Sequence, residues 1–489
     1  MTDDRTREEL AAVILAAGYG KRLKSRLVKV MHPVAGRPML SYSVEVVRSL
    51  GVRYPVLVVG RGAERVREFL GDEVIYVEQS ERLGTGHAVL QARPVLEGRS
   101  RAVLVLYGDM PLLKLEALRR LVELHQADGA PVVMLTVLSD DAMGFGRILR
   151  DARDNRVLGI VEEAAATLEQ LAIRELNVGV YCFETTWLWE HLPRICLSPK
   201  GEYYLTDLVG MAVDEGCRVQ TMTIDDVTEA QGINTRVHLA RAEAIMRRRI
   251  NERWMLAGVT LVDAETTYIQ SDVTIGQDTT ILANTHLTGT TAIGHDCIIG
   301  PNTLIDSSTV GDGCVIRFSV VEEATIEDDV DVGPFAHLRK GTHLARGVHM
   351  GNFGEVKNSY LGPGTKVGHF SYLGDATVGE NVNIGAGTIT CNYDGQRKHR
   401  TVIEDGAFIG SDTMLVAPVR VSEGSKTGAG SVVTRDVPPD SVVYGVPARL
   451  KTKGEGSKPS EEEDIILPLD SPGADAIDCE AGEPGGETL

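Results

Sequence analysis

Two glycines and two cations near the start of the chain have the types and spacing of a phosphate-binding loop. The segment from Leu15 to Leu23 follows an apolar run, and Lys29 comes shortly after it. Gly18 and Gly20 allow a sharp backbone turn whose N–H groups can approach a ligand closely. Together with the positive charges of Arg22 and Lys29, such amides suit a polyphosphate.

Two commoner glycine loops are excluded by the residues around this motif. A dinucleotide-binding loop needs a third glycine where the chain has Leu23. A P-loop needs glycine where the chain has Leu15, and serine or threonine where it has Arg22. Taken alone, the motif fits a phosphate site and an ordinary tight turn equally well.

Further motifs of the first half place polar residues next to glycines or after apolar runs. Asp109 follows the run 102–106, and a carboxylate there can hold Mg²⁺ against substrate phosphates or cap the next turn. The glycines of 83–88 can let a flat base approach the backbone or can start a helix. The segments that could line a sugar pocket are 144–147, 160–162 and 177–179.

One histidine of the second half suits general acid–base chemistry. His369 is the best general-base candidate, because imidazole titrates near neutral pH. On its own it also fits a surface histidine on a turn. A ten-residue interruption of the local pattern, at 391–400, is the kind of loop in which function often lies. Other polar candidates are Glu355, Lys357 and Tyr372 and, within the interruption, Asn392, Tyr393 and Lys398.

Alternating apolar runs and helical stretches must position the motifs of the first half. The strand-like runs are 11–15, 55–59, 74–77, 102–106 and 132–137. Helical stretches such as 41–50 and 115–125 separate them. This alternation predicts a Rossmann-like α/β domain with a mainly parallel sheet. Ligands of such sheets bind beyond the carboxyl ends of the strands, which is where the motifs lie.

From about residue 259 onward, an aliphatic residue recurs every six positions. The four series are 275, 281, 287, 293, 299 and 305; 326, 332, 338, 344, 350 and 356; 361, 367 and 373; and 403, 409, 415 and 421. A hexapeptide repeat of this kind predicts a parallel β-helix in which each aliphatic side chain points into the coil.

A helix at 234–256 is expected to connect the two patterns as a rigid strut. Its arginine run 247–249 fits a solvated face better than a nucleic-acid patch, because the chain around it is acidic. The expected domains are 1–235, the linker helix 236–256, a β-helix at 257–450 and an acidic tail at 451–489. The expected apolar face of the helix consists of Val237, Ala240, Ala244 and Met246.

Composition limits the class of protein. A chain of 489 residues is too long for a single hydrophobic core, so two or more domains are expected. The net charge of −19 argues against general nucleic-acid binding. No apolar run is long enough for membrane insertion, the first ten residues hold no signal-peptide core, and the seven cysteines form no Cys-x-x-Cys pair. A cytoplasmic protein is therefore expected. The tail has eleven acidic residues against three lysines and is expected to be disordered.

The order of these motifs carries a family resemblance. The glycine loop, the segment 84–88, Tyr107-Gly-Asp109 and the segment 201–207 resemble sugar-1-phosphate nucleotidyltransferases. With 366–375 and 391–394 added, residues 10 to 450 resemble the bacterial bifunctional N-acetylglucosamine-1-phosphate uridylyltransferase/glucosamine-1-phosphate N-acetyltransferase family. The resemblance implies a left-handed β-helix, a homotrimer with active sites between subunits, and small-molecule rather than macromolecular substrates.

The resemblance also implies roles in uridylyl transfer from UTP to N-acetylglucosamine 1-phosphate. Arg22 and Lys29 would hold phosphates, and Mg²⁺ would be bound by Asp109 and Asn234. No protein nucleophile is needed, because positioning and charge neutralisation supply the catalysis. The implied nucleotide loop is Leu15, Ala16, Ala17 and Gly18, and the implied uracil and sugar contacts are Gln79, Gly84, Thr85, Tyr107, Gly146, Glu162 and Asn177.

The roles implied for the second half concern acetyl transfer from acetyl-CoA to glucosamine 1-phosphate. His369 would be the base and Glu355 its orienting carboxylate. The implied sugar phosphate contacts are Arg339, Lys357, Tyr372, Asn383 and Lys398. Asn392 and Tyr393 would lie beside the reacting amine and thioester, and Ser411 and Ala429 would line the coenzyme A channel.

Two departures and two alternatives stay open at this point. Lys21 stands where the family usually has Thr or Ser, and Val28 where it has Pro, which can loosen the presentation of Lys29. One alternative is a nucleotidyltransferase with a purely structural β-helix. The other is a non-catalytic regulatory scaffold, like the translation-initiation exchange-factor subunits of similar plan, which would need neither Asp109 nor His369.

Overall fold

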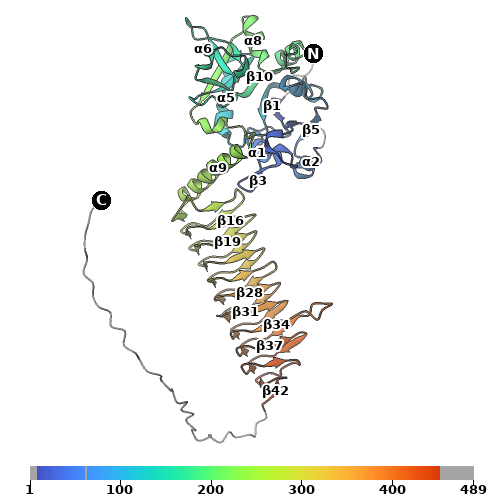
Figure 1. Ribbon diagram of the computed structural model, residues 1–489, viewed down its shortest axis with the longest axis vertical. Helices are drawn as coiled ribbons and strands as arrows, with labels where there is room; N and C mark the ends of the chain where they lie inside the picture. Colours follow the sequence, from blue (N-terminus) through green and yellow to red (C-terminus); the bar gives the residue numbers. More distant parts are fainter. Residues whose placement is uncertain (1–7, 61–62, 452–489) are drawn as a thin grey trace, which may run out of the picture.

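The computed structural model describes residues 8–60 and 63–451, so the expected tail, apart from Lys451, lies outside the described residues. An α/β domain lies at one end, helix α9 follows it, and a long β-helix extends away from them (Figure 1). The predicted fold class is confirmed. The helices of the α/β domain include α1 (Met39–Ser49), α2 (Glu64–Leu70), α3 (Thr85–Leu90), α4 (Arg93–Leu96), α5 (Leu115–Asp128), α6 (Leu168–Leu171), α7 (Thr185–His191) and α8 (Asp207–Asp214).

The α/β domain is built on a nine-stranded sheet with the order β11-β7-β10-β6-β1-β4-β5, and β8 and β9 attached through β10. Strand β10 runs antiparallel to both β6 and β7, whereas β1, β4, β5 and β6 are parallel to one another. The bounds are β1 (Glu8–Leu15), β4 (Val56–Val59), β5 (Ile75–Glu78), β6 (Ser100–Tyr107), β7 (Val132–Leu138), β8 (Arg147–Arg150), β9 (Val157–Val161), β10 (Glu175–Glu184) and β11 (Val219–Ile224).

Alternating side chains of the central strands build a core on each face of this sheet. Ala12 and Ile14 of β1 point into a cluster with residues of α1 and α5, and Ala11 and Val13 point into one with residues of α3, α7 and α8. Leu15 pairs with Tyr107 at the carboxyl ends of β1 and β6. The glycine loop and Asp109 therefore begin side by side at one edge of the sheet.

The β-helix stacks three sheets of 12, 10 and 9 strands, whose pairs are parallel except for the last pair, β41 (Val442–Tyr444) with β42 (Arg449–Leu450). Ile275, Ile281 and Leu287 fall on β14 (Thr274–Ile275), β15 (Thr280–Ile281) and β16 (His286–Thr288), one in each sheet, and all three are buried. Every sixth residue thus enters the core from the next face, which confirms the prediction from the repeat. Buried hydroxyls between these positions bond main-chain carbonyls, as Thr279 Oγ1 does to Gly294 O at 2.8 Å.

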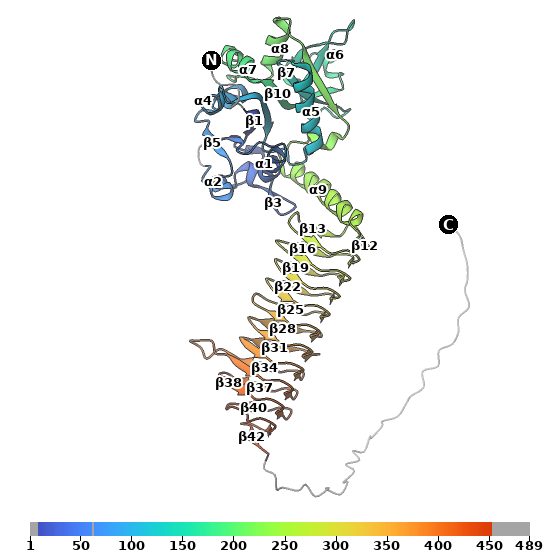
Figure 2. The ribbon, with the colours of Figure 1, turned by 180° about the vertical axis from the view of Figure 1, so that it is seen from behind.

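The ten-stranded sheet carries several polar candidates of the second half. Its strands include β25 (His337–Leu338), β28 (Gly354–Lys357), β31 (Ser371–Gly374) and β34 (Ile389–Cys391). After β34 the chain leaves the coil and returns at β35 (Thr401–Ile403). Figure 2 shows this excursion as an arm that projects sideways from the β-helix.

Helix α9 (Arg236–Leu256) joins the two parts. Of its predicted apolar face, the burial of Met246 is confirmed, but the other three positions are wrong. Val237 is 59% exposed, and Ala240 and Ala244 are also exposed. The buried positions follow Ala242, Met246 and Ile250, which are spaced four residues apart. This stripe was hard to identify because it is narrow and polar residues surround it.

The arginine run of α9 is part of the domain junction rather than a solvated face. Arg247 lies over the ring of Tyr268 in the first coil, 4.5 Å from its centroid. Arg249 donates to Leu112 O at 2.7 Å and to Asp226 Oδ2 at 3.0 Å. Of the three arginines only Arg248 is exposed, so the expectation of a solvated face was wrong.

Asp226 connects this junction to the α/β domain and gives a prediction about stability. Partial burial acts to raise its pKa, but hydrogen bonds from Lys114 and Thr228 outweigh burial and hold the pKa well below its usual range. Its stabilising effect is therefore complete above the unfolded-state pKa of about 3.9 and is lost as the pH falls below that value. Asp226→Asn should lower the free energy of unfolding by about 1 kcal/mol at pH 7, since the carboxylate is partly exposed.

Urea unfolding of both proteins between pH 7 and pH 3 measures this difference. It should stay constant down to about pH 4.5 and shrink below about pH 4. The exposed neighbour Asp225 offers the control Asp225→Asn, which should have little effect at any pH. An equal loss for Asp226→Asn at pH 7 and pH 3 would contradict the role of the charge.

Candidate active sites

A cavity of about 920 Å³ opens at the carboxyl edge of the nine-stranded sheet. Residues predicted from separate motifs meet in its lining, which agrees with the rule that parallel sheets bind ligands at this edge. The predicted residues that line it are Leu15, Ala16, Ala17, Gly18, Lys29, Gln79, Gly84, Thr85, Tyr107, Asp109, Gly146, Glu162, Asn177 and Asn234.

Arg22 is the one predicted residue of this half that the structure places outside the cavity lining. It is exposed on a short 3-10 helix, Lys21–Leu23. Arg82, which the sequence reasoning missed, lines the cavity instead. Its Nε donates to Ala17 O at 2.5 Å, and its guanidinium lies over the ring of Tyr19. Its only sequence signal is its place between Gln79 and the glycines of 84–86.

Lys29, Asp109 and Asn234 form a charged cluster at the floor of the cavity. The Lys29 ammonium is paired with the Asp109 carboxylate and donates to Asn234 Oδ1 at 2.7 Å. Ile233 N–H donates to Asp109 O at 3.0 Å, which holds the chain before α9 against the end of β6. The carboxylate and amide oxygens thus converge on one cation. Two such oxygens, completed by substrate phosphates and water, fit the preference of Mg²⁺ for oxygen ligands.

The part of the cavity near β5, called the slot below, is lined by Gln79, Gly84 and Thr85. Gln79 is 4% exposed, and its Nε2 donates to Gly84 O at 3.0 Å. Gly84 has a φ of +99°, which only glycine adopts readily. Thr85 Oγ1 accepts from Leu205 N–H at 3.0 Å, so the segment 201–207 is fixed against the same slot.

Polar groups at the other end of the cavity come from β10, the turn after β9 and the end of β6. Asn177 Nδ2 donates to the Tyr181 hydroxyl at 2.7 Å, and Glu162 Oε1 accepts from Thr206 at 3.2 Å. Burial, together with the negative charges of Asp109 and Glu162, raises the pKa of Tyr107 far above its ordinary value. The Tyr107 hydroxyl therefore stays neutral and can both donate and accept a hydrogen bond.

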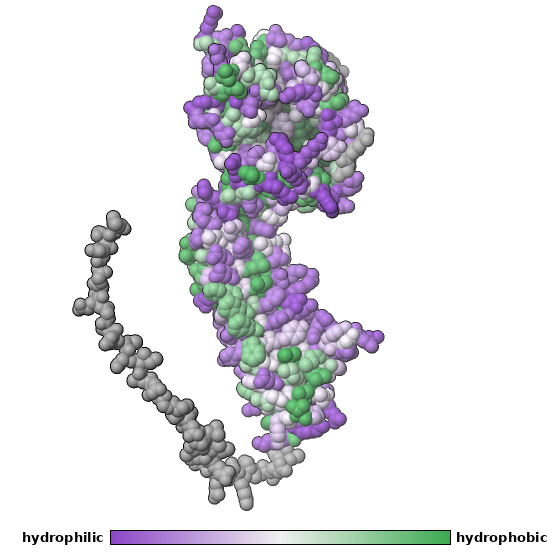
Figure 3. All heavy atoms as spheres, in the orientation of Figure 1, coloured by the Kyte–Doolittle hydropathy of each residue, from purple (hydrophilic) through white to green (hydrophobic). Residues whose placement is uncertain are grey.

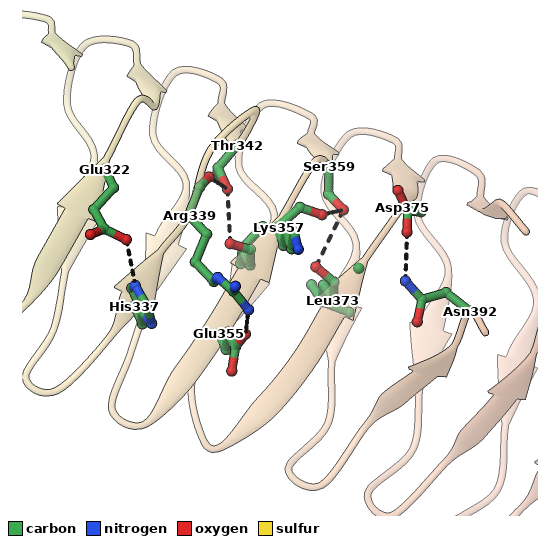
Figure 4. A network of polar contacts seen from close by, with 12 residues as sticks. Glu322, His337, Arg339, Thr342, Glu355, Lys357, Ser359, Leu373, Asp375 and Asn392 are labelled. Carbon is green, nitrogen blue, oxygen red and sulfur yellow. Dashed lines mark hydrogen bonds and ion pairs between the residues drawn. The ribbon is translucent and has the colours of Figure 1, made fainter. Parts of the chain in front are cut away.

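A second cluster follows the ten-stranded sheet of the β-helix. Glu355 and Tyr372 are paired positions of β28 and β31, and Arg339 Nη1 donates to Glu355 Oε1 at 2.7 Å. Figure 4 shows Arg339, Glu355 and Lys357 on neighbouring coils and Asn392 further along the same sheet. A row of cations beside a carboxylate can bind a phosphorylated amino sugar.

His369 lies at the end of this row, in the turn between β30 (Lys366–Val367) and β31. Its side chain is exposed. Within residues 8–60 and 63–451, no hydrogen bond joins it to Glu355, whose carboxylate bonds Arg339 instead. Ser411 and Ala429 lie in the turns of later coils that correspond to the turn of His369. These two turns are adjacent, because Gly430 N–H donates to Ser411 O at 2.8 Å.

The remaining predicted residues lie elsewhere on the coils. Asn383 belongs to β33 (Asn383–Ile384) of the twelve-stranded sheet. Asn392, Tyr393 and Lys398 are on the excursion, where Tyr393 pairs with Lys398 as an antiparallel bridge. One chain therefore brings together Arg339, Glu355, Lys357 and Tyr372, but it leaves His369 and the excursion at opposite ends of β31.

Comparison with known proteins identifies the family. Residues 12–175 match the MobA-like NTP transferase domain, residues 272–307 the bacterial transferase hexapeptide (six repeats), and residues 400–435 the hexapeptide repeat of succinyl-transferase. The "Bifunctional protein GlmU" of Syntrophotalea carbinolica is 49% identical over 438 residues, which cover 89% of this chain and 94% of that protein. The chain belongs to the GlmU family.

Other GlmU proteins agree with this assignment. Those of Heliobacterium modesticaldum and Pelobacter propionicus are 50% and 48% identical, and the alignments cover 87% and 91% of this chain and 93% and 98% of those proteins. As a GlmU protein, the chain is a bifunctional acetyltransferase and uridylyltransferase of UDP-N-acetylglucosamine synthesis. The purely structural β-helix and the regulatory scaffold are thereby excluded.

Gly84 provides a prediction about the uridylyl cavity. A Cβ at this position would lie 2.6 Å from Tyr203 O and 2.7 Å from Tyr203 N, and its backbone is left-handed. Gly84→Ala should therefore push the segment 201–207 away from the slot and lower kcat/KM for uridylyl transfer by about 10-fold or more. Steady-state assay of pyrophosphate release measures this effect.

Gly210→Ala is the matched control for that experiment. Gly210 lies in α8 of the same domain, and a Cβ there would meet nothing within 4 Å. This variant should keep wild-type uridylyl transfer. Wild-type kcat/KM for Gly84→Ala would show that the slot tolerates the added atom and would contradict the assignment.

Proposed function

We propose that the two reactions of the family are divided between residues 1–235 and 257–450, with 236–256 as the linker. The uridylyl reaction belongs to the cavity of the nine-stranded sheet, and the acetyl reaction belongs to the surface of the β-helix. The observation that carries this division is the separate clustering of phosphate-binding and general-base candidates. Lys29 and Asp109 meet at one end of the molecule, and His369 lies on a distant coil.

In the uridylyl site a phosphate oxygen of N-acetylglucosamine 1-phosphate attacks the α-phosphorus of UTP, and pyrophosphate leaves. Lys29 neutralises phosphate charge, and the amides of Ala17 and Gly18 support the nucleotide, whereas the Ala16 N–H donates to Val58 O. Gln79 and Gly84 recognise uracil, and Glu162 and Asn177 orient the sugar. Bound Mg²⁺, held by Asp109 and Asn234, supplies further neutralisation of charge on the phosphates.

In the acetyl site His369 accepts a proton from the amino group of glucosamine 1-phosphate. The nitrogen then forms a bond to the acetyl carbonyl carbon, the carbon–sulfur bond breaks, and the proton passes to the coenzyme A thiolate. Arg339, Lys357 and Lys398 hold the sugar phosphate by charge. The residues proposed for the remaining contacts are Glu355, Tyr372, Asn383, Asn392, Tyr393, Ser411 and Ala429.

We also propose that this acetyl site is completed between subunits of a homotrimer. His369 and Asp375 flank β31, so they are separated by roughly 15–20 Å of extended chain, and Asn392 is bonded to Asp375. One chain therefore cannot bring its own Asn392 to its own His369. A neighbouring copy related by threefold symmetry can supply that group.

An exposed aromatic ladder supports this assembly. Phe318, Phe335 and Phe353 follow one another along one corner of successive coils, with ring centroids 5.8 and 5.3 Å apart, and Phe370 continues the corner beside His369. Three of these side chains are more than half exposed. Figure 3 shows apolar surface, in green, gathered along the β-helix. Apolar surface of this extent is typical of a protein–protein contact.

The substrates favour the cytoplasm, where UTP and acetyl-CoA are available. The described cysteines, including the half-buried Cys217 and Cys391, are free thiols, as expected in a reducing compartment. No helix in the described part of the chain is long and apolar enough to cross a membrane. The acidic net charge of −19 disfavours nucleic acid as a partner.

Asp109→Ala tests the uridylyl assignment. The variant loses the carboxylate that faces Lys29, so uridylyl transfer should fall by about 10²-fold or more, while acetyl transfer stays nearly unchanged. Both rates are measured on one preparation, with folding checked by circular dichroism. Equal loss of both activities in a folded variant would contradict the division.

His369→Ala tests the acetyl assignment. A positioned general base contributes roughly 10²–10⁴-fold, so acetyl transfer should fall by about that factor while uridylyl transfer is unchanged. The residual rate should rise between pH 6 and pH 9, because more of the sugar amine is then already deprotonated. Light scattering checks that the assembly is intact. Wild-type acetyl transfer at neutral pH would show that His369 is only a surface residue.

A further inference from the structure

The excursion at 391–400 is a hairpin whose outer part is held by its own contacts. Asp394 Oδ1 accepts from the backbone N–H groups of Gln396 and Arg397 at 2.7 and 2.6 Å. His399 N–H donates to Asn392 O at 2.8 Å, which closes the hairpin. These contacts fix the shape of the hairpin, but they do not fix its direction relative to the β-helix.

Asp375 contacts the base of this hairpin three times, in addition to the main-chain bond from Ala417 N–H to Cys391 O at 3.2 Å. Its Oδ2 accepts from Asn392 Nδ2 at 2.6 Å where the excursion leaves, as Figure 4 shows. Its main-chain oxygen accepts from Thr401 N–H at 3.2 Å where the excursion returns. Lys398 Nζ lies 4.0 Å from the same Oδ2. Asp375 therefore holds the base of the hairpin on both sides, where the excursion leaves the coil and where it returns.

Asp375 is itself firmly held. Its Oδ1 accepts from Asn358 Nδ2 at 2.6 Å, and its N–H donates to Lys357 O at 3.1 Å. The side chain is only 15% exposed, and its φ of 51° is one that aspartate tolerates better than most residues. A carboxylate is required here because it offers acceptors only, so each oxygen can receive one carboxamide N–H.

We propose that Asp375 is a positioning residue for acetyl transfer, acting through Asn392 and Lys398. It joins the coil that carries Lys357 to the hairpin and sets where the hairpin presents these two side chains. The proposal rests on the proposed function, which gives Asn392 and Lys398 their roles. Asp375 touches neither substrate nor cofactor in this account.

Asp375→Asn is the informative change, because asparagine keeps the size and tolerates the same backbone. Its amide offers one acceptor and one donor, so one of the two carboxamides loses its partner, and Lys398 loses the nearby charge. In the full-length protein, kcat/KM for acetyl transfer should fall about 10- to 100-fold, while uridylyl transfer stays unchanged. Limited trypsin digestion should cleave faster after Arg397, Lys398 and Arg400, and not elsewhere.

Asp329→Asn is the matched control. Asp329 also has a left-handed backbone, with φ 59°, and pairs with Arg346 one coil further on at 2.8 Å, but it makes no contact with the hairpin. This variant should keep both activities and the wild-type digestion pattern. Cleavage spread over the whole chain of Asp375→Asn, with loss of both activities, would indicate general destabilisation and overturn the proposal.

Asn392→Ala separates failure of this proposal from failure of the proposed function. If Asn392→Ala lowers acetyl transfer and Asp375→Asn does not, the positioning role is wrong and the proposed function stands. If neither variant changes acetyl transfer, the assignment of the hairpin to the acetyl site is wrong as well. Faster cleavage of the hairpin without any loss of acetyl transfer also overturns the positioning role.

Discussion

The inward spacing of one aliphatic side chain in every six residues is the constraint on which the second half of the molecule depends. Because Leu338, Val356 and Leu373 must all enter the same core, the outward residues of their strands stack in fixed register. Glu355 and Tyr372 are neighbours for this reason, although seventeen positions separate them in the chain. A shift by one residue would turn the polar row inward and bury its charges.

In the first half of the molecule, a different constraint brings residues that are distant in the chain to one site. The loops that follow parallel strands all begin at the same edge of the sheet. The segments after β1, β5 and β6 therefore line one cavity, although no sequence pattern links these distant segments. The charges of the side chains then determine which of them pair inside the cavity. Lys29 meets Asp109 and Asn234 because a cation inside a partly buried cavity needs acceptors, and those acceptors suit a metal ion and phosphates as well.

Local motifs predicted the cavity well because each one combines a strand end with a glycine, and strand ends converge. What the sequence could not reveal depends on contacts distant in the chain. Arg82 is anchored to Ala17, and Asp375 is anchored to Asn358 and Asn392, so neither belongs to a local pattern. Of the buried stripe of α9 only Met246 was predicted, because the helix also makes polar contacts to the α/β domain, such as that of Arg249.

We propose that two separate sites act in sequence and that the acetyl site needs two copies of the chain. A test of both points mixes purified His369→Ala and Asn392→Ala proteins, which are then dissociated and reassembled. Random hybrids should regain about a quarter of wild-type acetyl transfer, because a neighbour then restores one intact pair of groups. Uridylyl transfer should not change on mixing. Acetyl transfer that stays at the level of the separate variants, in hybrids shown to have formed, would contradict the account.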